Sequence, residues 1–462
     1  MIRLEKHGMR WEMVPEFEPC REAVLGQEAR IIKQSPAKEV RVCDWNGKRY
    51  YIKRYLHRVH PLRPLKYLLK TSPARKEWEL AAALEKRNIP IVRHLALGEF
   101  WKGLGLQESV LVTEGFEGEP VRCDRADEAS TVLGFVERMH KAGVLQKDLH
   151  GANLLCHPET GEIRMVDLYG SEIHEALTKE HRDHNLAVLR MTLAIPVSEE
   201  VAALSRELRR GVMYRRSKRA LKHNREFEPR RAGGVRWQVR IPMDCEFITG
   251  VLNDPDGFLA GPARLFKAGR SSTVGAGRDM VLKRYNFKKP LNLLKDLFRP
   301  TRAMRAFRLA HHLELAGLPT ARPLAAGIRT RFGLTTTSYL LMKELKGAVP
   351  LEEATQDQSC LVAGVARLVG RLHDEGFSHR DLKITNLMVG PKGQLYLIDL
   401  EGLRFVGRIG VRRAHADLER LQRSALTIPT LEPGWLRPFL RAYCQVRRIR
   451  GRAASQFFRW SS

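Results

Sequence analysis

The chain has 462 residues, of which 43% are hydrophobic, so it is long enough for two or three globular domains that each bury a core. Lys and Arg outnumber Asp and Glu by 80 to 52, and the net charge of +28 indicates a polyanionic partner, such as anionic lipid headgroups or a phosphorylated glycolipid, or simply a basic soluble protein. Nucleic acid is not expected, because no zinc-finger, RNP-type or helix-turn-helix pattern accompanies the charge. No apolar run is long enough to span a membrane and residues 1–10 lack a signal-peptide core, so we expect a cytoplasmic protein.

The first element with a candidate binding residue is a predicted strand at residues 51–55, which alternates in polarity and follows a turn at 45–47. A strand with the same pattern is predicted at residues 281–285, after a turn at 275–277. Each strand has a lysine at its centre, Lys53 or Lys283. Such a lysine can reach nucleotide phosphates as a point charge, although a solvated strand lysine is an equally good interpretation.

A set of three residues occurs twice further along the chain. Each set has an Asp, an Asn five residues later, and a second Asp after two short predicted strands and a turn. In a phosphoryl-transfer site the first Asp accepts the proton of the acceptor hydroxyl, while the Asn and the second Asp bind magnesium held on ATP. One such residue alone is more often a cap or turn residue, but the whole set found twice favours this chemistry. The sets are Asp148, Asn153 and Asp167, then Asp381, Asn386 and Asp399.

The repeat extends to other turns and strands, which predicts two domains in tandem. We place them at residues 1–224 and 225–462, with the boundary somewhere within 205–253, where charge is dense and no motif falls. Residues 200–224 are expected to form the last helices of the first domain. Residues 235–240 alternate like a strand and are expected to open the sheet of the second domain.

Both halves resemble the lipopolysaccharide core kinase family, the heptose and Kdo kinases of Gram-negative bacteria. The resemblance covers most of the chain and is strongest in the second half, where residues 301–307 and 413–421 look like family segments. It implies an α+β fold of tandem protein-kinase-like bilobal domains, each with an antiparallel sheet lobe and a helical lobe. It also implies ATP and Mg²⁺ as cofactors and a sugar hydroxyl of the core, on heptose or Kdo, as the acceptor.

The resemblance also implies a role for each matched residue. The first domain would use Lys53 on the phosphates, Glu77 to orient Lys53, Asp148 as the base, and Asn153 with Asp167 on Mg²⁺. Glu79 is close enough in sequence to compete with Glu77. The second domain would use Lys283, Asp381, Asn386 and Asp399 in the same roles, and Lys383 to stabilise charge on the transferred phosphoryl group.

Three departures from the family pattern bear on which domain works. Counting back from matched turns places Ala306 opposite Glu77, so the second domain lacks the glutamate that pairs with its lysine. Gln146 stands where the second domain has His379, a residue that usually braces the catalytic loop. The expected phosphate loops, residues 33–37 and 269–273, lack a G-x-G-x-x-G pattern. Because every base and magnesium position is nevertheless filled in both halves, we expect two competent domains, with one catalytic domain and a degenerate partner as the alternative.

Other functions stay open at this stage. A kinase with a protein or small-molecule acceptor, or a tandem pseudokinase scaffold in envelope biogenesis, is also compatible with these residues. The acceptor implied by the resemblance is membrane-linked, so the protein would act at the cytoplasmic side of the inner membrane. Residues 54–70 and 284–299 interleave basic residues with aromatic and leucine residues, which is typical of an interfacial segment or of a basic connector packed on its own lobe.

Overall fold

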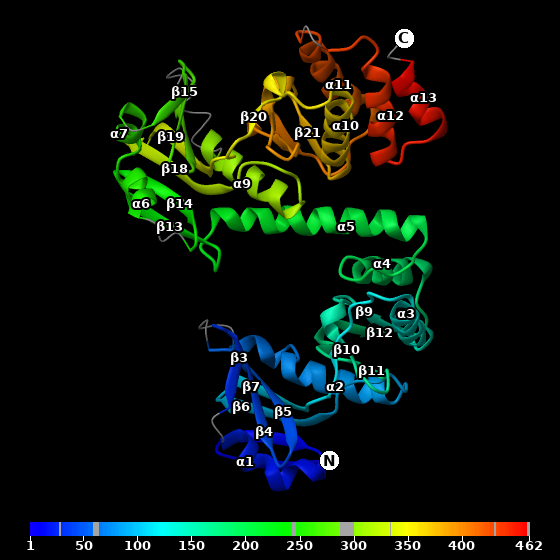
Figure 1. Ribbon diagram of the computed structural model, residues 1–462. Helices are drawn as coiled ribbons and strands as arrows, with labels where there is room; N and C mark the ends of the chain where they lie inside the picture. Colours follow the sequence, from blue (N-terminus) through cyan, green and yellow to red (C-terminus); the bar gives the residue numbers. More distant parts are fainter. Residues whose placement is uncertain are drawn as a thin grey trace. The chain divides into compact units, whose positions relative to one another are not determined.

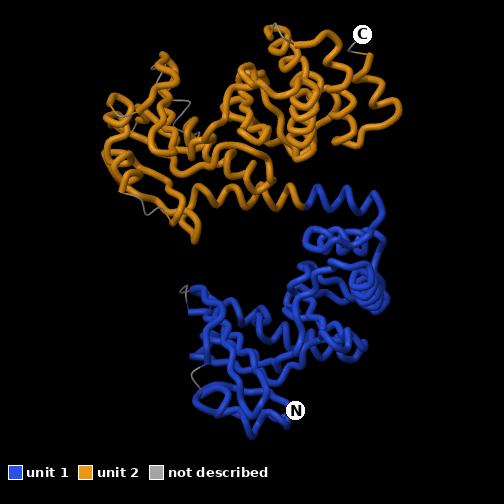
Figure 2. Tube along the Cα trace, in the orientation of Figure 1, with its two compact units in different colours: residues 1–208 blue, residues 209–462 orange. Residues whose placement is uncertain are grey.

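The computed structural model describes residues 1–26, 29–58, 64–242, 246–261, 263–286, 300–332, 334–428 and 431–459. The chain forms two compact units, Met1–Leu208 (unit 1) and Arg209–Ser462 (unit 2), shown in Figure 2. The division falls inside the predicted interval of 205–253 and before residue 224. Helix α5 (Glu199–Ser217) runs across it.

The sheet lobe of unit 1 is a seven-stranded antiparallel sheet in the order β1-β2-β6-β7-β5-β4-β3 (Figure 1). Lys53 lies on β5, whose neighbours are β4 and β7. Alternate side chains of these strands enter a core with Trp11, Phe17 and Ile52. The strands are β1 (Ile2–Lys6), β2 (Met9–Met13), β3 (Arg30–Ser35), β4 (Lys38–Trp45), β5 (Lys48–Leu56), β6 (His94–Lys102) and β7 (Gly105–Glu114).

Helix α2 (Pro73–Glu85) packs against β5, β6 and β7. It begins where Ser72 Oγ accepts the Arg75 N–H at 3.1 Å, which satisfies one of the amide groups left free in a first helical turn. Ser72 Oγ also donates to Glu99 Oε1 on β6 at 2.8 Å, so the cap ties the helix to the sheet. The lobe also contains α1 (Arg21–Gly26), η1 (Pro15–Cys20) and η2 (Pro64–Leu68).

The helical lobe of unit 1 packs around a second core that includes Phe135, Met139 and Leu149. Two small antiparallel sheets, β8-β10-β11 and β9-β12, belong to this lobe, and the predicted loop residues lie between or directly after their strands. Its helices and strands are β8 (Glu119–Pro120), α3 (Ala126–Lys141), β9 (Val144–Gln146), η3 (Gly151–Asn153), β10 (Leu154–Cys156), β11 (Ile163–Met165), η4 (Leu168–Gly170), β12 (Ser171–Ile173) and α4 (Lys179–Arg190).

Unit 2 repeats this topology strand for strand. Its seven-stranded sheet has the order β13-β14-β18-β19-β17-β16-β15, which is the unit 1 order with each strand replaced by its counterpart. The small sheets β20-β22-β23 and β21-β24 repeat as well. The strands are β13 (Phe227–Ala232), β14 (Val235–Arg240), β15 (Arg264–Ala268), β16 (Ser272–Gly277), β17 (Met280–Asn286), β18 (Pro323–Arg331), β19 (Leu334–Lys343), β20 (Val349–Pro350), β21 (Phe377–His379), β22 (Leu387–Val389), β23 (Leu395–Leu397) and β24 (Leu403–Phe405).

The helices of unit 2 include a counterpart of α2. This helix, α9, begins at Thr301, whose Oγ1 accepts the Met304 N–H at 3.4 Å. The largest core of the unit lies in the helical lobe and includes Phe377, Phe439 and Tyr443. The helices are η5 (Lys218–Leu221), α6 (Glu246–Asn253), α7 (Pro255–Ala260), α9 (Arg302–Leu315), η7 (Leu351–Glu353), α10 (Gln358–Asp374), η8 (Ile384–Asn386), η9 (Leu400–Gly402), α11 (Val411–Ala425), α12 (Leu436–Val446) and α13 (Gly451–Phe458).

The predicted α+β fold, with two kinase-like bilobal domains, is confirmed. Residues 235–240 form the predicted strand, β14, but the prediction that it opens the sheet is wrong because β13 precedes it in a hairpin. Arg230 and Arg231, in the charged interval predicted to hold the domain boundary, belong to that hairpin. The part of α5 after Leu208 and all of η5, which were expected in the first domain, belong to unit 2. There Arg210 Nη1 donates to the Asp374 carbonyl at 2.7 Å, and Tyr214 stacks on Phe405.

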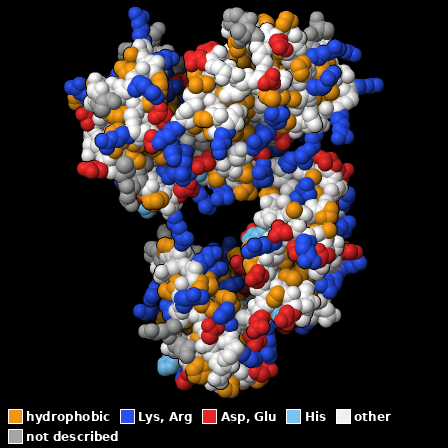
Figure 3. Space-filling view, in the orientation of Figure 1, with side chains coloured by type: hydrophobic (Ala, Val, Ile, Leu, Met, Phe, Trp, Pro, Cys, Tyr) orange, Lys and Arg blue, Asp and Glu red, His pale blue; other side chains and the backbone are white. Residues whose placement is uncertain are grey.

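Among the described residues, no helix combines the length and the apolar character needed to cross a bilayer. Lys and Arg side chains are scattered over both units on the face that Figure 3 shows. Of the two basic segments predicted for a membrane surface, residues 59–63 and 287–299 lie outside the described residues.

Candidate active sites

The catalytic-loop segment of unit 1 is held by hydrogen bonds among its predicted residues. Asn153 Nδ2 donates to the Asp148 carbonyl at 3.0 Å, which closes the five-residue step into a tight loop. Gln146 Nε2 donates to the Asp167 carbonyl at 3.1 Å, and Gln146 Oε1 accepts the Asp148 N–H at 3.2 Å. The Val166 N–H also donates to the Asn153 carbonyl at 2.9 Å. The structure therefore brings Asp148, Asn153 and Asp167 together.

Unit 2 contains the same network with one change of side chain. Asn386 Nδ2 donates to the Asp381 carbonyl at 2.8 Å, and the Ile398 N–H donates to the Asn386 carbonyl at 2.9 Å. His379 Nε2 donates to the Asp399 carbonyl at 3.0 Å, while its Nδ1 accepts the Asp381 N–H at 3.3 Å.

Gln146 thus makes the two bonds that His379 makes, because an amide and a neutral imidazole both offer one donor and one acceptor. Burial lowers the pKa of His379, which favours the neutral ring that these two bonds require. The substitution that the sequence marked as a departure preserves the brace of the loop.

The second aspartate of each set has the same unusual backbone. Asp167 and Asp399 lie in the left-handed region, with φ of 56° and 50°, which few residues other than Gly, Asn and Asp adopt. The glycine three residues later leaves room for the brace: a Cβ on Gly170 would lie 2.5 Å from Gln146 Oε1, and one on Gly402 would lie 3.0 Å from the Asp381 nitrogen. The D-x-x-G spacing is therefore required by packing as well as by chemistry.

The lysine of unit 1 is paired with the predicted glutamate. Lys53 Nζ donates to Glu77 Oε1 at 2.6 Å and lies 3.8 Å from Asp167 Oδ1. Glu77 is almost fully buried, with 1% of its side chain exposed, and Tyr55 Oη donates to its other oxygen at 3.5 Å. Burial alone would raise the pKa of Glu77, but the Lys53 ammonium and the nearby His94 outweigh it and hold the pKa at about 2. Glu79, the competing candidate, is exposed.

The lysine of unit 2 is also ion-paired, but with different acids. Lys283 Nζ lies 3.0 Å from Asp399 Oδ1 and 3.0 Å from Glu401 Oε1, and only 11% of its side chain is exposed. Burial would lower the pKa of Lys283, but Tyr285, Asp399 and Glu401 outweigh it and raise the pKa above its usual value. The ammonium group of Lys283 is therefore held in place by two carboxylates, although Ala306 occupies the position that Glu77 has in unit 1.

The first aspartate of each set faces solvent. The side chain of Asp148 is 78% exposed and that of Asp381 is 60% exposed, so an acceptor can approach both carboxylates. Lys383 Nζ lies 3.0 Å from Asp381 Oδ2, and His150 Nε2 lies 3.8 Å from Asp148 Oδ2. Each unit thus places a basic side chain beside its exposed aspartate.

Sequence analysis missed the residues that anchor these loops from behind. In unit 1, Asn185 on α4 donates through Nδ2 to the Gln146 carbonyl at 2.6 Å and accepts from His140 Nε2 at 3.0 Å. In unit 2, Asp417 on α11 accepts the His379 N–H at 3.0 Å and lies 3.3 Å from His373 Nε2. The shared position in both repeats is the signal that could have identified this pair.

Lys38 and Glu401 were also missed. Lys38, at the start of β4, lies over the Tyr55 ring at 5.1 Å, and burial lowers its pKa while Asp167 counteracts that effect. Glu401 occupies the position that Tyr169 has in unit 1. The influence of Asp167 on Lys38 and the ion pair of Glu401 with Lys283 join residues more than 100 positions apart, which motif spacing alone does not reveal.

Among the described residues, no cluster of three or more His, Cys, Asp or Glu side chains forms a complete metal site. Magnesium does not need such a cluster, because it accepts one or two protein oxygens together with phosphate oxygens and water. The Asn153 and Asn386 amide nitrogens are used within the loop, which leaves the amide oxygen as the atom suited to a cation. The residues present therefore fit magnesium held with a nucleotide.

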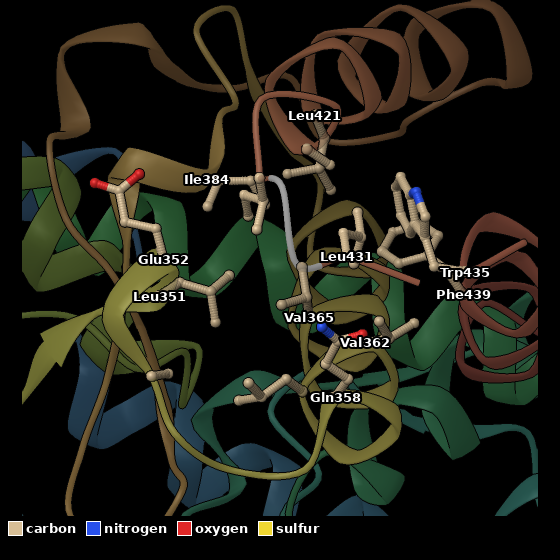
Figure 4. Close-up of a pocket in the computed structure, with 14 residues that line it drawn as sticks. Leu351, Glu352, Gln358, Val362, Val365, Ile384, Leu421, Leu431, Trp435 and Phe439 are labelled. Atoms are coloured by element: carbon tan, nitrogen blue, oxygen red, sulfur yellow. The ribbon is translucent and has the colours of Figure 1, made fainter. Parts of the chain in front are cut away.

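An apolar pocket lies in the helical lobe of unit 2 (Figure 4). Trp435 and Phe439 form one side, Leu351 lies on the opposite side, and Ile384 connects the pocket to the loop. Ile384 is three residues after Asp381, and its N–H donates to Ser424 Oγ at 2.9 Å. None of the candidate site residues is among the described residues that line this pocket.

Each unit thus combines a lysine on a central antiparallel strand with a braced Asp–Asn loop and a following Asp, which defines a protein-kinase-like fold. The comparisons with known proteins agree with this class. The model of the lipopolysaccharide kinase (Kdo/WaaP) family matches residues 20–207 and 269–443, one segment in each unit and more than half of the chain. The chain belongs to this family.

Individual relatives include kinases of 3-deoxy-D-manno-octulosonic acid (Kdo). Such a kinase from Xylella fastidiosa (strain M12) is 34% identical over 131 residues, 28% of this chain and 51% of the relative. Those from Xanthomonas campestris pv. campestris (strain B100) and Vibrio cholerae serotype O1 are 36% identical over 136 residues and 29% identical over 127 residues. The chain spans about half the length of these curated relatives.

Two solved structures also resemble part of the chain. WaaP in complex with acyl carrier protein has 19% identity and a TM-score of 0.32, with 42% of this chain and 86% of that chain covered. WbdD has 15% identity and a TM-score of 0.27, with 43% of this chain and 50% of that chain covered.

Proposed function

We propose that the chain is an ATP- and Mg²⁺-dependent kinase that phosphorylates a sugar hydroxyl of the lipopolysaccharide core. The single observation that supports this most strongly is the braced loop, present in both units of a chain of the lipopolysaccharide kinase family, with an exposed aspartate beside the cation-binding pair. ATP supplies the transferred phosphoryl group, and Mg²⁺ neutralises charge on its phosphates.

In this proposal the exposed Asp148 and Asp381 orient the acceptor hydroxyl and accept its proton. Their carbonyls accept hydrogen bonds from Asn153 and Asn386, so the base and the amide ligand of the cation are held in one rigid loop. Lys383, 3.0 Å from Asp381, is close enough to stabilise negative charge on the phosphoryl group in transit. The brace removes the conformational search for these groups, which is the main contribution a protein can make to phosphoryl transfer.

In each unit the strand lysine binds the phosphates. The second aspartate of the set, whose backbone is in the left-handed region, completes the cation site. Lys53 is held by Glu77, and Lys283 is held by carboxylates of the helical lobe. Asp167 and Asp399 lie 3.8 Å and 3.0 Å from these lysines, so phosphate and cation would share one small region in each unit. Because both sets of residues are complete, we propose that both units are active.

We propose Kdo as the acceptor sugar, with heptose as the competing acceptor. The support is that the curated relatives are named Kdo kinases, although the match spans half of their length. The net charge of +28 favours an acceptor that carries phosphate and carboxylate groups. The lipid-linked acceptor would be met at the cytoplasmic side of the inner membrane.

A membrane contact is supported by the described end of the first basic segment. In η2 and the residues after it, Leu65, Leu68 and Leu69 are 47%, 49% and 93% exposed, beside exposed Lys66 and Lys70. Leucine and lysine side by side favour an anionic bilayer surface. Binding to phosphatidylglycerol vesicles should weaken in the Leu69→Glu and Lys66→Glu/Lys70→Glu variants, with phosphatidylcholine vesicles as the control. Unchanged binding would refute a contact at this segment.

The activity itself is tested by incubating the full chain with γ-labelled ATP, Mg²⁺ and one acceptor at a time. The acceptors are Kdo-lipid A, heptosylated core lipopolysaccharide, a generic protein substrate and an aminoglycoside. We expect magnesium-dependent label on Kdo-lipid A, located on the sugar by mass spectrometry. Label on the protein or the aminoglycoside alone would replace the proposed acceptor, and no nucleotide turnover with any acceptor would favour a pseudokinase scaffold.

A further inference from the structure

The lysine of unit 2 has lost the partner that its counterpart has in unit 1. Helices α2 and α9 begin at equivalent caps, Ser72 and Thr301, so Glu77 and Ala306 occupy the same position five residues on. Ala306 is 2% exposed and lies in an apolar cluster. No carboxylate can reach Lys283 from this position of the helix.

The second polar group around Glu77 has been replaced as well. His94 Nε2 lies 3.8 Å from Glu77 Oε1, and His94 pairs with Thr113 on β7. The matching strand pair in unit 2 places Pro323 opposite Met342. The glutamate and its histidine neighbour are thus both replaced by apolar residues in unit 2. The region between α9 and the sheet that corresponds to the surroundings of Glu77 therefore has no charged group at either position.

The missing charge reappears on a different element. Glu401 lies in η9, two residues after Asp399, and its Oε1 is 3.0 Å from Lys283 Nζ. The equivalent residue of unit 1, Tyr169, carries no charge and lies under Lys76 Nζ at 4.9 Å. One unit therefore has the glutamate on the helix and a tyrosine on the loop, while the other has alanine on the helix and the glutamate on the loop.

We propose that Glu401 is the positioning residue of Lys283 and takes the place in unit 2 that Glu77 has in unit 1. This inference rests on the proposed function, since Lys283 needs to be positioned only if it binds nucleotide phosphates. Asp399 also lies 3.0 Å from Lys283, but it is the proposed cation ligand, like Asp167 in unit 1, where Lys53 has Glu77 as a further partner. Among the residues that the structure describes, Glu401 is the other carboxylate that lies beside the ammonium group.

The relocation changes what the ion pair connects. Lys53 and Glu77 both belong to the sheet lobe with its helix α2, whereas Lys283 lies on β17 and Glu401 lies in the helical lobe. In unit 2 the pair therefore bridges the two lobes of the unit directly. Placement of Lys283 depends on the approach of the lobes and not on the position of helix α9.

The test measures nucleotide affinity at each lysine separately in the full chain. Lys53 and Lys283 are acetylated with N-hydroxysuccinimide acetate at increasing concentrations of Mg-ATP, and mass spectrometry gives the ATP concentration that halves labelling of each peptide. This concentration is independent of the intrinsic reactivity of either amine. Each lysine serves as the internal control for the other.

Glu401→Gln should raise the half-protecting ATP concentration at Lys283 about tenfold, as expected for the loss of one charge-assisted hydrogen bond, and leave Lys53 unchanged. Glu77→Gln should do the reverse. Glu401→Asp, which keeps the charge, should recover at least part of the affinity at Lys283. Glu353→Gln, at an exposed glutamate of the same unit, should change neither value.

Three results would overturn the inference. These are unchanged protection of Lys283 in Glu401→Gln, failure of Glu401→Asp to recover any affinity, and equal loss of protection at both lysines, which would mean that Glu401 stabilises the whole fold. Absence of ATP protection at both lysines of the wild-type chain is a different result. It would reject nucleotide binding and hence the proposed function itself.

Discussion

The buried pair Lys53–Glu77 gives the sharpest prediction for stability. Glu77→Gln removes the negative charge, keeps the shape of the side chain, and leaves Lys53 without its closest acid. The pKa of Glu77 lies at about 2 instead of 4.5, which corresponds to about 3 kcal/mol of stabilisation of the folded state. Breaking one side of a buried ion pair typically costs about 3–5 kcal/mol, so the two magnitudes agree.

The sign of the pH dependence follows from the direction of that shift. A carboxyl with a lowered pKa in the folded state stabilises the fold fully above its unfolded value near 4.5, and the contribution is lost as the pH falls toward 2. The Glu77→Gln variant should therefore be less stable than the wild type at pH 7. The two proteins should converge only as the pH approaches 2.

Hydrogen exchange followed by mass spectrometry measures this effect within one unit. At pH 7, peptides from α2 and β5 should exchange roughly a hundredfold faster in Glu77→Gln, which is the equivalent of about 3 kcal/mol. Peptides from α9 and β17 of the same molecule serve as the reference. The matched control is Glu79→Gln, because Glu79 is exposed on the same helix. Less than a threefold change in α2 for Glu77→Gln would refute this account of the pair.

The remaining predictions concern the brace of unit 1 and a buried histidine of unit 2. Gln146→His should keep at least a third of the phosphate transfer that depends on Asp148, because histidine retains a donor and an acceptor for the brace. Gln146→Leu, which has neither, should reduce this transfer more than tenfold. Equal activity of the two variants would contradict the brace. Burial lowers the pKa of His312 to about 4, so the unfolded chain binds the proton first and stability falls as the pH drops from 6.5 toward 4. Urea denaturation measures how much the free energy of unfolding decreases between pH 7 and pH 5. This decrease should be about 2 kcal/mol smaller in His312→Phe than in the wild type. The same decrease in both proteins would show that His312 is not the group responsible.

Local spacing explains how much of the site could be predicted from the sequence. Lys53, Asp148 and Asn153 lie in motifs whose spacing is fixed by a strand or a single loop, so repetition of the motif is enough to identify them. The lysine strands and the short hairpins before Asp167 and Asp399 are confirmed for the same reason. The catalytic, nucleotide and metal roles of these residues stay predictions.

The residues that sequence analysis missed act across long separations. Glu401 forms an ion pair with Lys283 across more than 100 positions. In the sequence it is visible only as a glutamate at the position where the first repeat has Tyr169, a single difference between the repeats. The packing of residues after Leu208 on unit 2 depends on contacts such as Arg210 with Asp374, which charge density at a boundary does not reveal. Strand β13 was not predicted, because its adjacent arginines made the segment look like part of a charged domain boundary. In the structure these arginines lie on one strand of a hairpin.

The most direct test of the central proposal is phosphate transfer from labelled ATP to Kdo-lipid A by the wild-type chain, Asp148→Asn, Asp381→Asn and the double variant. Two active units predict partial loss in each single variant, at least a hundredfold loss in the double variant, and unchanged folding by circular dichroism. Different product sites in the two single variants would assign one acceptor hydroxyl to each unit. Full activity in the double variant would contradict the account, because the reaction would then not depend on either aspartate.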